Sequence, residues 1–382
     1  HQLHTTFPIE YHDFVMNTTT PLHANHTRHQ AGLSLVELMV ALVIGLILTA
    51  GVISVYLTSK KSYSSDTGLS QIQENGRFAL SFMEPAVRMG GFLGCARSNS
   101  PINHIANSAD ITSKPEYDFA KPVEGYDYTG TDVGDNYALP VSIAVDNNSV
   151  NWSPTPPSSI FDVIKTYTIP GSDILVVHEA SASQYDIVDD PRGSGTYSVK
   201  DDIPVAATYA TDFSVGQIAV ASDCQNVSIF QVTDTGAGAG PLKHDDGGTT
   251  PGNNNASATS PWAESYGQGA QVTLAETYIY FIGKSPTDNS PALFQVSLDD
   301  TGVLGTPVEL VPDIENMQIV YGVDTDNDKV PNQYVSAATV DTDGKWGSVV
   351  SVRVALITRS DDFIVEQTPA TAQVLDLDGV NV

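Results

Sequence analysis

The stretch that decides the fold reads LSLVELMVALVIGLILTAGVISVYL and occupies residues 33–57. It contains a single charged side chain, Glu37, and is followed by Lys60 and Lys61. A helix of this length can cross the hydrocarbon core of a bilayer. The run is too long for an ordinary secretory signal, and no A-x-A-like cleavage site follows it. The sequence therefore predicts one membrane-spanning helix, with residues 1–32 in front of it.

Glu37 is the unusual residue of this apolar segment. A carboxylate inside a membrane span costs about 2.5–3.5 kcal/mol on insertion scales, so such a residue is a functional candidate. The alternative is that Glu37 lies close enough to the helix start to extend its carboxylate to the interface.

The helical pattern continues beyond the apolar segment. Apolar residues recur there at spacings of three and four, at Leu69, Ile72, Ala79 or Leu80, Met83 and Val87. This spacing is typical of one face of an amphipathic helix. The pair Gly90-Gly91 is expected to end it. We therefore expect one helix from Leu33 to Met89, with residues 33–59 in the membrane and residues 60–91 forming its amphipathic second half.

Residues 92–382 show a strand pattern instead, with short β-branched and aromatic runs separated by Gly, Pro, Asn and Asp. The expected strands are Asp173–Val177, Phe213–Ala221, Val227–Val232, Thr277–Ile282, Ala292–Val296, Met317–Val323 and Val349–Ile357. The fourth and fifth should form a hairpin. The last is apolar at nearly every position and is expected to be a central strand, with Met317–Val323 beside it. Residues 236–261 are expected to form a mobile surface loop. The fold class is α+β.

The net charge is strongly negative, with 17 Lys+Arg against 45 Asp+Glu and a formal value of −28. Such a surface repels phosphate backbones, so the sequence argues against nucleic-acid binding. No metalloprotease, hydrolase, nucleotide-binding or CxxC motif is present, so we expect no enzyme. His178-Glu179 follows a predicted strand and is interpreted as an exposed surface pair.

The two cysteines, Cys95 and Cys224, lie far apart in the sequence. An oxidising compartment would favour a disulfide that closes a loop of about 130 residues and stabilises the fold by about 4–5 kcal/mol. Two buried free thiols are the alternative.

An acidic segment offers a candidate metal site. Its carboxylates stand at alternate positions, Asp324, Asp326 and Asp328, which is how a calcium-binding loop begins. Lys329 stands where such a loop has a glycine, and Val335 where it has its closing glutamate, although Asn332 could supply an oxygen. A solvated acidic turn is the alternative, and apart from this possible calcium ion no cofactor is expected.

The residues Gly32-Leu33-Ser34-Leu35-Val36-Glu37 resemble the prepilin processing motif of type IV pilins and type II secretion pseudopilins. The resemblance implies that residues 1–32 are a leader peptide, that a prepilin peptidase cuts between Gly32 and Leu33, and that the new N-terminus is methylated. It implies that residues 33–59 form the filament core after assembly. It also implies that Glu37, the fifth mature residue, contacts the N-terminal amine of a neighbouring subunit. Leu33 departs from the commonest residue at that position, phenylalanine. Residues 1–15 are interpreted as lying upstream of the true start, which would be Met16.

Two further stretches, QIQENGRFAL at residues 71–80 and RMGGFLGC at residues 88–95, resemble the PilW-type minor pilins. Residues 222–233 and 349–357 support the same resemblance. It implies a single-pass inner-membrane protein with a periplasmic domain that primes the pilus and then lies at its tip. The implied partners are other minor pilins, the major pilin, the inner-membrane assembly platform and a large tip adhesin. The alternatives are a minor pseudopilin of a type II secretion system and a membrane-tethered adhesin or binding module.

Overall fold

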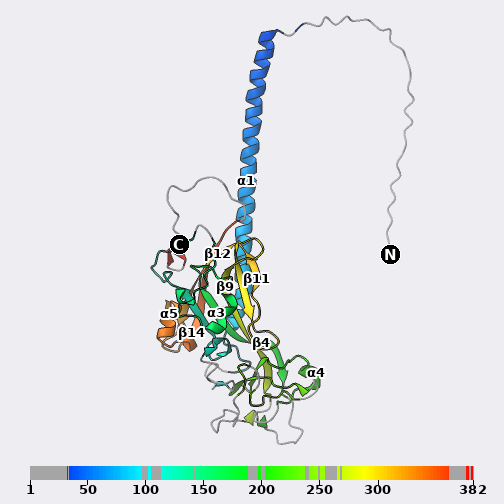
Figure 1. The fold of residues 1–382 in the computed structure, drawn as a ribbon, viewed down its shortest axis with the longest axis vertical. Helices are drawn as coiled ribbons and strands as arrows, with labels where there is room; N and C mark the ends of the chain where they lie inside the picture. The colour runs from blue at the N-terminus through cyan, green and yellow to red at the C-terminus, as the bar shows by residue number, and fades with distance from the viewer. Residues whose placement is uncertain are drawn as a thin grey trace, which may run out of the picture. The chain divides into compact units, whose positions relative to one another are not determined.

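The computed structural model describes residues 32, 34–96, 102–104, 113–140, 143–187, 197–198, 203–236, 241–247, 250–253, 265–266, 269–360, 376–377 and 380–381. The chain divides into two compact units, His1–Lys60 and Lys61–Val382. Helix α1, Leu35–Met89, belongs to both units and has 55 residues (Figure 1). A single long helix followed by a β-rich domain confirms the predicted α+β class. Leu33, where the helix was expected to begin, lies outside the described residues.

In the first unit, every described side chain of α1 is exposed. An 18-residue window of this helix reaches a mean hydropathy of 2.7 with none of its residues buried. Among the described residues, α1 is the one helix long and apolar enough to cross a membrane. The apolar side chains that predicted the helix are therefore not buried by the other described residues of this chain.

In the second unit, α1 buries one face against the β domain. The buried positions are Gly68, Ala79, Met83 and Ala86, and the last three share a core cluster with strands of both sheets. Pro85 lies inside the helix on an exposed turn. Gly91 ends it in a left-handed conformation, φ 77°, and donates its N–H to the His178 carbonyl at 2.8 Å. The predicted stop is confirmed.

The main sheet of the described residues has nine strands in the order β1-β7-β6-β9-β4-β2-β3, with β10 beside β9 and β11 beside β10. The strands are β1 Ile102–His104, β2 Val123–Tyr128, β3 Trp152–Ser153, β4 Ile174–Asp186, β6 Ile218–Ser222, β7 Val227–Gln231, β9 Gln271–Lys284, β10 Pro291–Ser297 and β11 Val308–Pro312. The long strand β9 pairs antiparallel with β4 on one edge, and with β6 and then β10 on the other. The predicted hairpin is the β9–β10 pair.

A second sheet of three strands has the order β13-β12-β14, formed by Gln333–Val335, Ile314–Val323 and Val349–Thr358. The central strand is therefore β12, and the prediction that Val349–Ile357 is central is wrong. Alternate side chains of β14, Val352, Val354 and Leu356, pack against the core while staying partly exposed. A continuous apolar run shows that a strand is covered, but it does not show that both of its edges are paired.

Short elements complete the fold. The helices are α3 Ser158–Ile164, α4 Ala207–Ala210 and α5 Ala337–Thr342, with 3₁₀ turns η1 Pro115–Tyr117, η2 Ser149–Asn151 and η5 Trp346–Ser348. Two small ribbons pair β5 Tyr197–Ser198 with β8 Ser265–Tyr266, and β15 Asp376–Leu377 with β16 Val380–Asn381. The largest core lies where α1, β4, β9 and β12 meet. Trp346 in η5 joins this core and contacts Tyr321 edge-to-face.

Some described residues of the range 236–261 pack against the rest of the β domain. Leu242 is fully buried and forms a bridge with Ile203. The Asn253 side chain accepts the Gln231 N–H at 2.8 Å and donates to the Gln231 carbonyl at 2.7 Å. Parts of residues 241–247 and 250–253 thus pack against neighbouring strands, because polar composition does not exclude side chains that complete a neighbouring strand's hydrogen bonds. The mobility of the range stays a prediction.

Candidate functional site

The predicted processing position lies in front of the helix. Gly32 is exposed and outside regular secondary structure, and Leu33 is not among the described residues. The helix is held from its start by the Leu38 N–H, which donates to the Ser34 carbonyl at 3.1 Å. Gly32 itself therefore lies in front of the helix.

Glu37 lies in the first turn of α1 and is exposed. A carboxylate is favourable there because the first N–H groups of a helix lack partners within it. Around it, the exposed side chains of the first unit are apolar, among them Leu38, Met39 and Val40. The position thus combines one negative charge with a surface that favours lipid or another apolar helix.

The predicted disulfide between Cys95 and Cys224 is confirmed, with the two Cα atoms 4.6 Å apart. Cys95 follows the end of α1, and Cys224 lies in the turn between β6 and β7. The bond therefore ties the chain just after the helix to the main sheet. Cys224 adopts a left-handed conformation, φ 67°, which is uncommon for a residue other than glycine.

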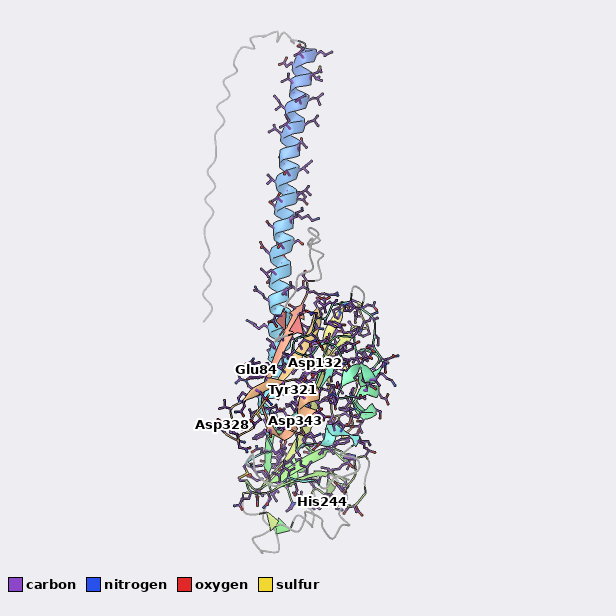
Figure 2. All side chains as sticks on the ribbon, turned by 90° about the vertical axis from the view of Figure 1, so that its left-hand side faces the viewer. Glu84, Asp132, His244, Tyr321, Asp328 and Asp343 are labelled. Carbon is purple, nitrogen blue, oxygen red and sulfur yellow. A yellow bond between two sulfur atoms is a disulfide. The ribbon has the colours of Figure 1, made fainter. Side chains whose placement is uncertain are left out.

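The acidic loop brings its three predicted carboxylates together. One oxygen each from Asp324, Asp326 and Asp328 lies within 4.8 Å of the others. Asp324 is buried at the end of β12, whereas Asp326 and Asp328 are exposed. Figure 2 labels Asp328 in this loop. Carboxylate oxygens gathered in this way suit a hard cation such as calcium.

The backbone of this loop explains how it forms without the expected glycine. Lys329 adopts the left-handed conformation itself, with φ 69°. The Asp324 carboxylate accepts the N–H groups of Asn327 at 2.7 Å and Lys329 at 2.9 Å. Asn332 directs its side-chain oxygen to the Thr325 N–H at 2.6 Å. Asn332 therefore closes the loop instead of facing the carboxylates, and calcium binding stays a prediction.

The interpretation of His178 as an exposed surface residue is wrong. Its side chain is fully buried in β4, and its two ring nitrogens lie 2.9 Å from the carbonyl oxygens of Lys121 and Pro115. Burial lowers the pKa of His178, whereas the two backbone carbonyls act in the opposite direction. His178 fixes the segment around η1 to the main sheet. The sequence prediction failed because the covering segment comes from another part of the chain.

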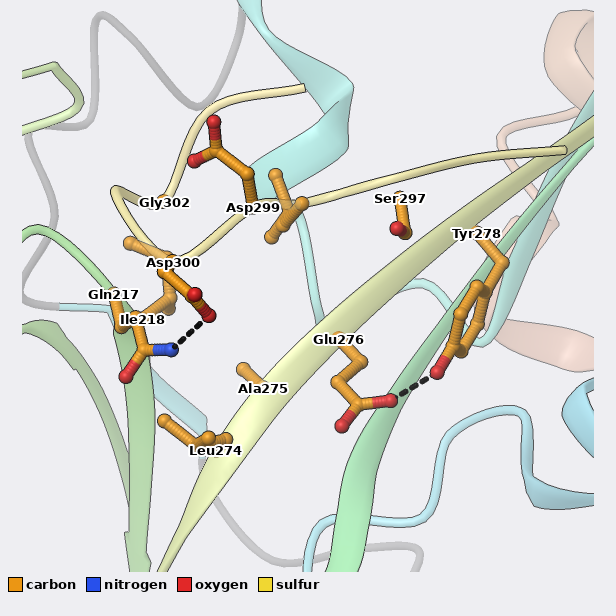
Figure 3. Close-up of a pocket in the computed structure, with 11 residues that line it drawn as sticks. Gln217, Ile218, Leu274, Ala275, Glu276, Tyr278, Ser297, Asp299, Asp300 and Gly302 are labelled. Carbon is orange, nitrogen blue, oxygen red and sulfur yellow. Dashed lines mark hydrogen bonds between the residues drawn. The ribbon is translucent and has the colours of Figure 1, made fainter. Parts of the chain in front are cut away.

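A cavity of about 230 Å³ lies where β9 passes from its pairing with β6 to its pairing with β10 (Figure 3). Its lining residues are Gln217, Ile218, Leu274, Ala275, Glu276, Tyr278, Ser297, Leu298, Asp299, Asp300 and Gly302. Three of these carry carboxylates and none is basic. The Tyr278 hydroxyl donates to Glu276, and Gln217 donates to Asp300 at 3.4 Å. The lining therefore favours a positively charged group over an anion.

Glu276 also faces a second glutamate. The antiparallel register of β4 and β9 sets Glu179 directly opposite it, and like charges in that relation repel. Burial and then the charge on Glu276 raise the pKa of Glu179 to about 7. Sequence inspection missed this pair because the two glutamates meet only through strand register.

Comparison with known proteins gives two family matches. Residues 279–382 match the model described as Type IV Pilus-assembly protein W, and residues 27–53 match the prokaryotic N-terminal methylation motif. No curated protein and no solved structure matches. The first match includes β10, β12 and β14, and the second includes Gly32, Glu37 and the start of α1.

Proposed function

We propose that this chain, which its two family matches identify as a PilW-type minor pilin involved in type IV pilus assembly, primes the filament and then lies at its tip. The observation that carries the proposal is the exposed apolar helix with one carboxylate in its first turn, continuous with a helix that packs on a disulfide-bonded β domain. Pilin-family domains are structural rather than catalytic, so we assign this protein a role in filament assembly.

The exposed helix needs an apolar environment before and after assembly. Its side chains between Leu35 and Leu57 are more than half exposed at most apolar positions. A bilayer can cover them in the unassembled subunit, and the helices of neighbouring subunits can cover them in a filament. We place the unassembled protein in the inner membrane, with the second unit on the periplasmic side.

In this proposal, Glu37 determines the position at which one subunit's helix docks along its neighbour's helix. An unpaired carboxylate in a medium of low polarity is costly, and a cation beside it compensates. Cleavage after Gly32 would create a new N-terminal amine on each subunit. A subunit would therefore gain most by docking where its Glu37 meets the amine of its neighbour.

Charge argues against a continuous stack of this subunit in the filament. A chain with a formal charge of −28 repels its own copies. A continuous stack of this subunit would bring those charges together, whereas one copy beside less acidic subunits would not. The proposed neighbours are therefore other minor pilins and the major pilin, together with the prepilin peptidase and assembly platform during export and a large adhesin at the tip.

The test compares Glu37→Ala with Glu74→Ala. Both remove one exposed glutamate from α1, but Glu74 lies in the amphipathic half. We expect Glu37→Ala to abolish recovery of the protein in sheared filaments and to lower piliation, whereas Glu74→Ala leaves both unchanged. Normal incorporation of Glu37→Ala would contradict the proposal and favour a tethered adhesin. Loss of protein secretion with normal piliation would favour a type II pseudopilin.

A further inference from the structure

Two carboxyl groups are buried together between the main sheet and β12. Asp127 at the end of β2 is 3% exposed, and Asp173 just before β4 is 2% exposed. The antiparallel register of β2 and β4 pairs Gly125 with Leu175 and Tyr126 with Ile174. Its continuation sets Asp127 opposite Asp173.

The hydrogen bonds of Asp173 identify it as the ionised member. One oxygen accepts the Tyr128 N–H at 2.9 Å, and the other accepts the Ile319 N–H at 2.8 Å. A protonated carboxyl would turn one of these oxygens into a donor facing a donor. Asp173 thus joins β2 to β12 as a carboxylate.

Asp127 has a different pattern. Its Oδ2 accepts the Ala338 N–H of α5 at 3.3 Å, whereas its Oδ1 is buried and has no hydrogen-bond partner among the described residues. An ionised oxygen without a donor is expensive to bury, and a protonated one is much less so. Oδ1 is therefore the atom that should carry a proton.

Among the described residues, the interactions recorded for the two acids include no cation. The ionisable groups that act on them are Asp132 from the segment after β2, and Tyr321 from β12. Tyr321 is fully buried, and its hydroxyl lies so close over β2 that a Cβ on Gly125 would be 1.8 Å from it. Tyr321 and Asp132 are labelled in Figure 2. Glu124 and Tyr126, on β2, act on Tyr321 in turn and add no positive charge.

We propose that Asp127 and Asp173 hold one proton between them at neutral pH, carried on Asp127 Oδ1, and that this proton keeps α5 and β12 packed against β2. The pair is a pH-sensitive latch between the two sheets. When the proton leaves to solvent, two negative charges face each other in a buried position. The contacts made by the Ala338, Tyr128 and Ile319 amides are the ones that loosen.

The direction of the pH effect follows from the burial. Burial raises the pKa of Asp127, against the backbone N–H groups of α5, and burial followed by the charge on Asp127 raises the pKa of Asp173. The folded chain therefore holds more protons than the unfolded chain between the usual aspartate pKa and the raised one. The contribution of this pair to the free energy of unfolding is fully present at acid pH. It falls as pH rises through this range, and it falls no further above the raised pKa.

The experiment uses the full chain in detergent. Infrared difference spectra against pH report protonated carboxyls, and thermal unfolding against pH reports protons released on unfolding. The variant is Asp127→Asn, whose side-chain oxygen can still accept the Ala338 N–H. The matched control is Asp132→Asn, which removes the same charge from an exposed neighbour.

We expect wild type and Asp132→Asn to show a protonated carboxyl at neutral pH that Asp127→Asn lacks. Between acid and neutral pH, Asp127→Asn should release about one proton fewer on unfolding than wild type does. The reason is that the variant lacks the carboxyl that is protonated in the folded chain and ionised in the unfolded chain. Glu179 also has a raised pKa, so the comparison is the difference spectrum between wild type and Asp127→Asn. A difference spectrum in which no protonated-carboxyl band is lost, or equal proton release, would overturn the proposal. If Asp127→Asn does not fold, the hydrogen-exchange protection factors of the Ile319 and Ala338 amides in wild type decide, after correction for the intrinsic rise of exchange with pH. Lower protection factors above the titration support the latch, and unchanged protection factors refute it.

Discussion

The disulfide between Cys95 and Cys224 gives the sharpest prediction about stability. The two residues are separated by 129 positions, and both belong to the second unit. In the chain-entropy model, opening a ring of about 130 residues costs about 5 kcal/mol of unfolding free energy. We therefore expect the double variant Cys95→Ser with Cys224→Ser to lose about 5 kcal/mol, a large share of the stability of a typical domain.

Urea unfolding of the full chain in detergent measures this loss. The matched control is the wild-type protein with its disulfide reduced, which should unfold at the same urea concentration as the double variant. The native structure should survive locally, because the end of α1 has other bonds to β4. Gly91 donates to the His178 carbonyl at 2.8 Å, and Ala180 donates to the Phe92 carbonyl at 2.7 Å. These two amides should stay protected from hydrogen exchange under native conditions.

A loss below about 1 kcal/mol would refute the reasoning, since it would mean that the ring does not restrict the unfolded chain as the model requires. Loss of protection at Gly91 and Ala180 would contradict the expectation that these two hydrogen bonds hold the end of α1 without the disulfide. It would show that the bond holds the end of α1 in place by itself, and that the effect lies in the folded state.

Three further predictions concern packing and the acidic loop. Met83→Ala should lower the unfolding free energy by about 2–5 kcal/mol in urea, because its buried side chain joins α1 to the main core; Leu80→Ala, at an exposed position of the same helix, should cost much less. Gly125→Ala should destabilise by about 1–3 kcal/mol or more, and Tyr321→Phe should restore part of this in the double variant, because it removes the atom nearest to the new Cβ. We propose that calcium raises the melting temperature of wild type but not of Asp324→Asn; no heat and no shift on calorimetric titration would remove this site.

The features that the sequence predicted well are local. The apolar run and the spacing of Met83 with its neighbours determine α1, and Gly91 ends it because a left-handed residue is needed there. The β9–β10 hairpin follows from two apolar runs separated by a short polar loop. Each of these depends on residues close together in the chain.

The features that sequence analysis missed depend on strand register and on coverage by distant segments. His178 is buried because the segment around η1 covers it, and no pattern near His178 shows this. Glu179 meets Glu276, and Asp127 meets Asp173, only because neighbouring strands pair in one particular register. The order of β12 and β14 was missed for the same reason, since side-chain composition does not report which edge of a strand is paired.

Processing of this chain and its assembly into a filament are the basis of the proposed function. Its most direct test is the N-terminal sequence and mass of the protein recovered from sheared filaments. We predict a start at Leu33 with a methylated amine, and therefore Glu37 as the fifth residue. A protein that still carries residues N-terminal to Leu33 in the filament fraction, or that is absent from that fraction, would contradict the account.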